Sequence, residues 1–209
     1  MHLKNVQYCL MALHLSYKSL NEISSILSHD KKFKTSIAES PTFRFYNYSL
    51  HYMLVMEICK LMEPNNSKGP AKYRDNHYAS LKRLIGEVEL SVPPSFKAIS
   101  ENLTNRIELL KCGLFSKILH LRDKKLAYSD MDQYGGPLSF KGFDIDEIEE
   151  CRELLDELQD ILKECISHFD YDIVIHSNTQ TQNLLKYVDE YKAFAKDNKW
   201  DFFKWQSKK

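Results

Sequence analysis

The chain has 209 residues, of which 43% are hydrophobic and 28% are charged, and this length is enough for one domain with a substantial buried core. Its 29 basic and 29 acidic residues cancel, which excludes a global electrostatic attraction to nucleic acid and confines any polyanion site to a local patch. Six glycines and six prolines are few for an all-β protein, so the long periodic segments predict an all-α fold.

The first half of the chain predicts three helices. Apolar residues at steps of three and four indicate a long first helix that ends near Ser28. The Ser-Pro pair at positions 40–41 suits the start of a second helix, which we expect to reach about Met62. Aromatic residues on most sides of its first half indicate burial on two faces, with a base-stacking platform as the alternative. A loop at 63–76 and a short third helix at about 77–88 follow.

A longer fourth helix is predicted at about residues 95–125, because one apolar stripe continues through that whole segment. A glycine-containing connection follows at 131–143. Asp144 and Glu147, three residues apart, nearly match the capping-box pattern and predict the start of the fifth helix. From Asp144 to Glu164 ten acidic residues stand against two basic ones, a net charge of minus eight, which indicates a solvated face that repels RNA.

The C-terminal part predicts a last helix at about 182–197 and then a tail with four aromatic residues among positions 200–205. Because a free tail would not keep so many aromatic side chains in water, we expect residues 171–209 to pack on the rest of the chain or on a dimer partner. Residues 1–170 then form the main domain, an up-down antiparallel bundle of about five to six helices.

Cysteines, histidines and hydropathy exclude several classes of protein. The five cysteines form no C-x-x-C pair and sit among apolar residues, which indicates reduced thiols that act as small core side chains in a cytoplasmic protein. The eight histidines lack ligand spacing, so we expect no metal site and no cofactor. No apolar run approaches the ~18–20 residues of a membrane span, and the first residues carry no signal-peptide cleavage pattern.

The segment from Leu119 to Asp130, L-H-L-R-D-K-K-L-A-Y-S-D, places more chemically capable side chains at a helix end than any other segment. Its part from Arg122 onward resembles the signature of the HEPN superfamily. The closest likeness is to the abortive-infection (AbiU-type) branch, in which a long helix ends in R-D-K-x-x-A-H-x-D. The predicted order of helices is similar to that branch over roughly residues 1–170.

This resemblance implies a dimer through the motif helices, and many members of the superfamily are metal-independent ribonucleases. In those members an arginine holds the scissile phosphate, and a histidine from an R-x(4–6)-H motif transfers protons near neutral pH. Arg122 matches the arginine, Lys125 is a further candidate phosphate or nucleotide contact, and Asp123 and Asp130 are the supporting residues of the motif. Tyr128 stands where the histidine is expected, and a phenol with a pKa of about 10 is a poor general base.

Three functions are compatible with these residues. The first is a protein of a phage-defence or toxin–antitoxin system that binds RNA or a nucleotide phosphate in a dimeric cleft, with Arg122 and Tyr128 as a catalytic pair of weak or lost ribonuclease activity. The second is an active metal-independent endoribonuclease toxin. The third is a non-enzymatic dimeric scaffold that binds a partner protein. In a plainer structural interpretation, Asp123 and Asp130 only pair with Arg122 and Lys124.

The expected partners follow from the same resemblance: a second copy of the chain, RNA, and an antitoxin or nucleotidyltransferase. Some HEPN toxins pair with a nucleotidyltransferase antitoxin and carry R-x4-A-x-Y, whose tyrosine receives AMP. Here Ala127 and Tyr128 are adjacent, so the spacing is one residue short of that pattern.

Overall fold

A computed structural model of the chain describes residues 3–28, 41–63, 80–90, 96–126 and 142–167, and every regular element within them is helical. The all-α class is therefore confirmed. The predicted last helix and the aromatic tail lie outside the described residues. The elements are α1 (Leu3–Ser28), α3 (Pro41–Met62), α5 (Leu81–Glu89), α6 (Phe96–Leu109), α7 (Leu114–His120), the π-helical turn η1 (Leu121–Leu126) and α8 (Ile145–Ile166).

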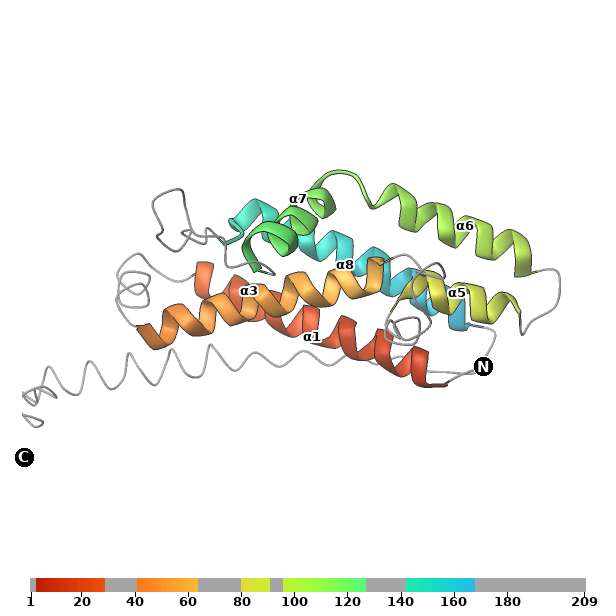
Figure 1. Cartoon of the computed structure of the whole chain (residues 1–209), viewed down its shortest axis with the longest axis horizontal. Coiled ribbons are helices and arrows are strands. Elements are labelled where there is room, and N and C mark those ends of the chain that lie inside the picture. The colour runs from red at the N-terminus through yellow and green to blue at the C-terminus, as the bar shows by residue number, and fades with distance from the viewer. Residues whose placement is uncertain (1–2, 29–40, 64–79, 91–95, 127–141, 168–209) are drawn as a thin grey trace, which may run out of the picture.

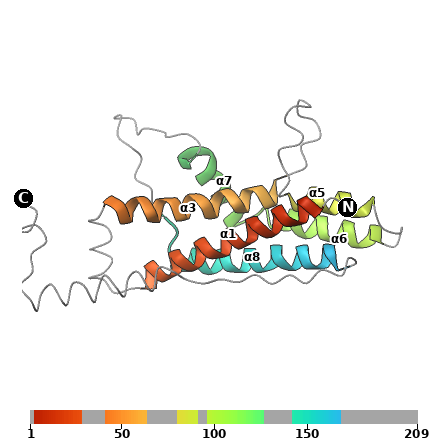
Figure 2. The same cartoon turned by 90° about the horizontal axis from the view of Figure 1, so that it is seen from below.

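The bundle is organised around α1. This helix packs against both α3 and α8 and runs antiparallel to each of them (Figures 1 and 2). The shorter helices α5 and α6 pack on α8, whereas α7 and η1 pack on α3. The end of the predicted motif helix therefore lies against α3.

The central position of α1 explains why its buried surface is wider than the predicted stripe. Leu13 and Leu20 on that stripe are fully buried, and so are Cys9, Ala12 and Ser16 beside it. Small side chains let two helices approach α1 closely, and the hydroxyl of Ser16 donates a hydrogen bond to the carbonyl of Ala12 at 2.8 Å. One apolar period predicts one contact face, whereas α1 has two.

The bounds predicted for α3 are confirmed, but its aromatic half is not buried on two faces. Phe45 is 72% exposed and Tyr52 is 41% exposed, whereas Leu54 and Ile58 in the second half are completely buried. Phe43 and Tyr46 pack partly against the core. Helix α3 contacts α1, α5, α7 and η1, but these contacts leave the side chains of Phe45 and Tyr52 at the surface of this single copy.

The prediction of one continuous helix from about 95 to 125 is wrong. Helix α6 ends at Leu109, and α7 starts after Gly113, whose φ is +67°. Side chains with a Cβ rarely adopt that backbone conformation, so the glycine permits the break. The apolar stripe continues across it through Leu110 and Leu114, which is why periodicity alone does not reveal it.

The cysteine interpretation holds for four residues and fails for one. Cys9, Cys59, Cys151 and Cys165 are buried, but Cys112 lies exposed in the break between α6 and α7. Burial raises the pKa of Cys151 and of Cys165 to about 12, so these thiols stay protonated and behave as core side chains.

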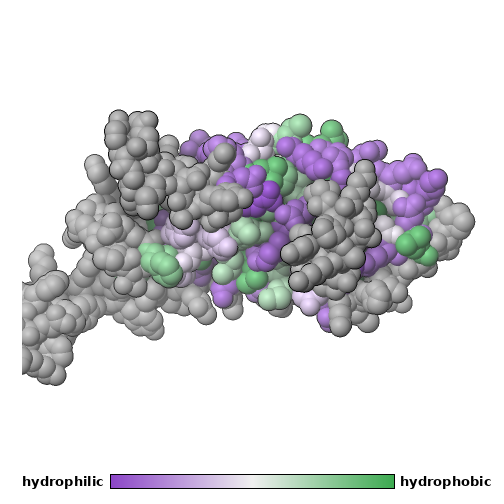
Figure 3. All heavy atoms as spheres, in the orientation of Figure 1, coloured by the Kyte–Doolittle hydropathy of each residue, from purple (hydrophilic) through white to green (hydrophobic). Residues whose placement is uncertain are grey.

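The acidic helix α8 begins as predicted. The carboxylate of Asp144 accepts a hydrogen bond from the Glu147 amide at 3.0 Å, and the Glu147 carboxylate accepts one from the Asp144 amide at 2.9 Å. Farther along, Arg106 of α6 donates to Glu157 at 2.7 Å and to Glu164 at 2.6 Å. On the face shown in Figure 3, small hydrophobic areas lie among hydrophilic residues. No helix in the described part of the chain is long and apolar enough to cross a membrane.

Candidate functional site

Arg122 occupies the π-helical turn η1, which follows α7 and packs against α3. Its Nη1 donates a hydrogen bond to Oε1 of Glu63 at 2.9 Å, and its Nε donates to Oδ1 of Asp123 at 2.7 Å. The arginine side chain is 23% exposed. The guanidinium is therefore held in one orientation by two carboxylates while part of it remains at the surface.

Glu63 is itself fixed where α3 ends. Its amide donates to the carbonyl of Cys59 at 2.9 Å, and its carbonyl accepts a hydrogen bond from the hydroxyl of Ser80 at 2.6 Å. Ser80 is buried and caps the first turn of α5 by accepting a hydrogen bond from the Arg83 amide. Glu63 thus connects the end of α3, the start of α5 and the motif turn.

Glu63 was not among the predicted site residues, because it falls in the loop predicted at 63–76. One signal for it existed. A carboxylate at the C-terminal end of a helix faces the negative end of the helix dipole and is unfavourable there unless a cation compensates it. Arg122 supplies that cation from 59 positions along the chain.

Arg122 keeps its charge beside the two carboxylates and a neighbouring thiol. The hydrogen bond to Asp123 raises the pKa of Arg122, so the guanidinium is always charged. Burial raises the pKa of the neighbouring Cys59 thiol to about 12 although Arg122 opposes the shift, so no thiolate is available here.

The structure places only part of the predicted site. Arg122 and Asp123 are in direct contact, as the plainer structural interpretation anticipated. The main chain of Lys125 belongs to η1. Its side chain, together with Tyr128 and Asp130, lies outside the described residues. Within the residues that the structure describes, no cluster of three or more histidine, cysteine, aspartate or glutamate side chains could hold a metal ion.

After the motif segment, Gly142 and Phe143 pack against His51 in the middle of α3. The ring of Phe143 stacks on His51 with 5.7 Å between ring centroids, and Nζ of Lys117 lies 5.9 Å from the Phe143 centroid. A Cβ on Gly142 would lie 2.5 Å from Nε2 of His51, so glycine allows the backbone to lie this close. Both ends of the segment 127–141 therefore start from positions on α3.

We expect His51 to make the fold sensitive to acid. Burial lowers its pKa, and the hydrogen bond from Nδ1 to the carbonyl of Asn47 at 2.8 Å opposes that shift only in part. Below its unfolded pKa of about 6.5 the unfolded chain binds the proton more readily, so stability should fall from there toward the lower folded pKa. Urea unfolding between pH 7.5 and 5 measures this slope. The non-titrating variant His51→Gln should show a shallower slope, and an equal slope would contradict the prediction.

Residues 5–194 match the sequence model of the AbiU2 protein family, HEPN_AbiU2. This range includes every described helix apart from the first two residues of α1. No curated protein matches the chain significantly. No solved structure does so either. Because the family match spans far more than half of the sequence, the chain belongs to the AbiU2 family of HEPN proteins.

Proposed function

We propose that this AbiU2-family protein acts in a phage-defence or toxin–antitoxin system by binding RNA through Arg122, in a cleft that two copies form together. Its ribonuclease activity is weak or lost. The proposal rests on the side chain of Arg122, which is oriented by Glu63 and Asp123 and yet remains 23% exposed. An arginine held in this way is prepared to receive a phosphate oxygen.

The two carboxylates leave the arginine able to bind a further anion. A guanidinium carries five N–H donors, and the described contacts use donors on Nε and Nη1. Asp123 is 55% exposed, and a surface ion pair of this kind contributes only about 0–1 kcal/mol. An incoming phosphate can therefore replace Asp123 at small cost, while Glu63 keeps the arginine in position.

One feature of the sequence argues against efficient cleavage. Tyr128 stands in the position of the histidine that transfers protons in related nucleases, and a phenol with a pKa of about 10 accepts few protons at neutral pH. RNA binding in this proposal depends on directed hydrogen bonds from Arg122 rather than on proton transfer.

A second candidate function is a dimeric scaffold for a partner protein such as an antitoxin. The exposed aromatic side chains of Phe45 and Tyr52 favour it, because aromatic residues on a helix surface are typical of protein interfaces. Both candidates require a homodimer. Light scattering at micromolar concentration would show a mass of two chains, and a monomer would contradict both.

Removing Arg122 tests the RNA-binding proposal. We expect Arg122→Ala to weaken binding of single-stranded RNA about tenfold, which corresponds to the loss of one charge-assisted contact. The slope of log affinity against log salt should become shallower by about 0.7 for each lost phosphate contact. Fluorescence anisotropy of a labelled oligonucleotide, in EDTA, measures both.

Arg106→Ala is the matched control. Arg106 is 25% exposed and also pairs with two carboxylates, so the substitution removes the same charge from an equivalent setting. It should leave RNA affinity unchanged. An equal loss in both variants would mean that only net charge matters, and no loss in either would favour the scaffold. Cleavage of the oligonucleotide by the native protein would establish the active nuclease instead.

A further inference from the structure

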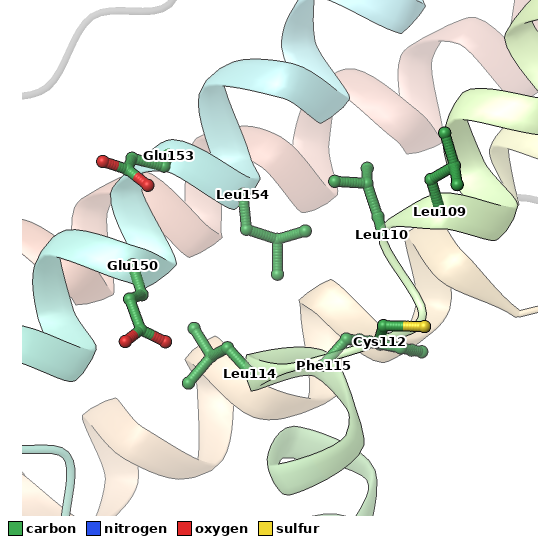
Figure 4. A pocket seen from close by; sticks show the side chains of 8 residues that line it. All are labelled: Leu109, Leu110, Cys112, Leu114, Phe115, Glu150, Glu153 and Leu154. Carbon is green, nitrogen blue, oxygen red and sulfur yellow. The ribbon is translucent and has the colours of Figure 1, made fainter.

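The break between α6 and α7 leaves a groove of about 270 Å³ beside α8. Figure 4 shows Leu110, Leu114 and Leu154 converging on this space from the break and from α8. Glu150 and Glu153 lie on its α8 side, and both are exposed. The volume is near the lower end of ligand pockets, about 300–1,000 Å³. It suits one or two bulky side chains rather than a large cofactor.

The groove joins an exposed apolar side chain to partly buried ones. Leu109 on its edge is 76% exposed, and Leu110 and Leu114 beside it are only partly buried. Two carboxylates stand next to this apolar area. The chemistry that complements such a surface is an apolar or aromatic side chain with a cationic one close to it in sequence.

The C-terminal segment of the same chain has that chemistry. Positions 200–209 read W-D-F-F-K-W-Q-S-K-K, with four aromatic residues and three lysines against one aspartate, a net charge of plus two. The segment can also reach the groove. Leu154 lies 12 residues before the end of α8 at Ile166, which is about 18 Å along a helix. The 34 residues from Ile166 to Trp200 would span about 50 Å even if all were helical.

We propose that the segment Trp200–Lys209 docks in this groove of its own chain. An aromatic side chain of the segment covers Leu109, Leu110, Leu114 and Leu154, and a lysine of the segment pairs with Glu150 or Glu153. Docking removes the aromatic segment from water and covers the exposed side chain of Leu109. It does not depend on RNA binding at Arg122.

Tryptophan fluorescence of the full chain is a direct test, because Trp200 and Trp205 are the two tryptophans of the protein. We expect blue-shifted emission and slow quenching by acrylamide in the native chain. Leu109→Glu removes an apolar contact and adds a third carboxylate at the groove, so the equilibrium constant for docking should fall about tenfold. Emission should then shift to the red and quenching should become faster.

Leu90→Glu is the control, since Leu90 is 89% exposed and does not line the groove. It should leave emission and quenching unchanged. Circular dichroism confirms that both variants remain folded. Exposed tryptophans in the native chain would overturn the proposal. Blue-shifted emission that does not change in Leu109→Glu would also overturn the proposal, because the segment would then pack elsewhere.

Cys112 gives a second and independent measurement. It lines the groove and is the exposed cysteine among the five of the chain. We expect alkylation of Cys112 to be slower in the native chain than in a chain ending at Asn198. In Phe203→Cys, mild oxidation should join the new thiol to Cys112 within one chain. A disulfide only between two chains would overturn docking in the same copy, and unchanged alkylation would overturn docking in the groove.

Discussion

Replacing Tyr128 with histidine is expected to create metal-independent RNA cleavage, about 10²- to 10⁴-fold faster than any cleavage by the native chain. An imidazole titrates near pH 6.5 and can accept and return a proton at neutral pH, whereas a phenol cannot do so efficiently. The phosphate contact is already present in this proposal, because Arg122 is oriented by Glu63 and Asp123. The assay follows a labelled single-stranded RNA in EDTA, from pH 5 to 9.

The variant Arg122→Ala combined with Tyr128→His is the decisive control, because it keeps the proton carrier and removes the phosphate contact. It should be inactive. Tyr128→Phe should bind RNA with the affinity of the native protein and show no cleavage. If Tyr128→His binds RNA normally but cleaves nothing over the whole pH range, the site is not a nuclease cleft that lacks only its proton carrier.

The largest loss of stability is expected from Leu54→Ala. Leu54 is completely buried in the core cluster, on the helix α3 whose end precedes Glu63. Removing a buried leucine side chain and leaving a cavity costs about 2–5 kcal/mol of the free energy of unfolding. Urea unfolding followed by circular dichroism measures it, and the dependence on urea should keep its slope because the same surface is exposed.

Leu90→Ala is the matched control for this substitution. Leu90 is 89% exposed, so the same chemical change should alter the free energy of unfolding by less than about 0.5 kcal/mol. Equal effects in the two variants would mean that α3 does not contribute to the core as described. A cost below about 1 kcal/mol for Leu54→Ala would indicate that the site is loosely packed.

Helix ends with local signals could be predicted from the sequence. Pro41 at the first position of α3 and the reciprocal bonds of Asp144 and Glu147 act within one helical turn, so they do not depend on the rest of the fold. The break at Gly113 was missed, although glycine is a known breaker, because the apolar period continues on both sides of it. Apolar periodicity indicates which side chains face the core, but it does not indicate whether the backbone between them is helical.

Surfaces were less predictable than helix ends. The aromatic residues of α3 predicted burial on two faces, yet Phe45 and Tyr52 are exposed although the same helix contacts α1, α5, α7 and η1. Conversely, Cys9, Ala12 and Ser16 are buried since α1 packs against both α3 and α8. Hydrophobicity does not record how many neighbours a helix has, and only the packed structure supplies that number.

The sequence by itself determined the fold class, the family and the place of Arg122 within its motif, because these depend on periodicity and on the order of residues along the chain. The tertiary structure decided what Arg122 contacts. Glu63 lies 59 positions away, and the ion pair exists because η1 packs against the end of α3. The groove beside α8 likewise forms from segments that are distant in sequence. Electrostatic and apolar contacts act over a few ångströms in space, so a linear sequence does not reveal them until the helices are placed.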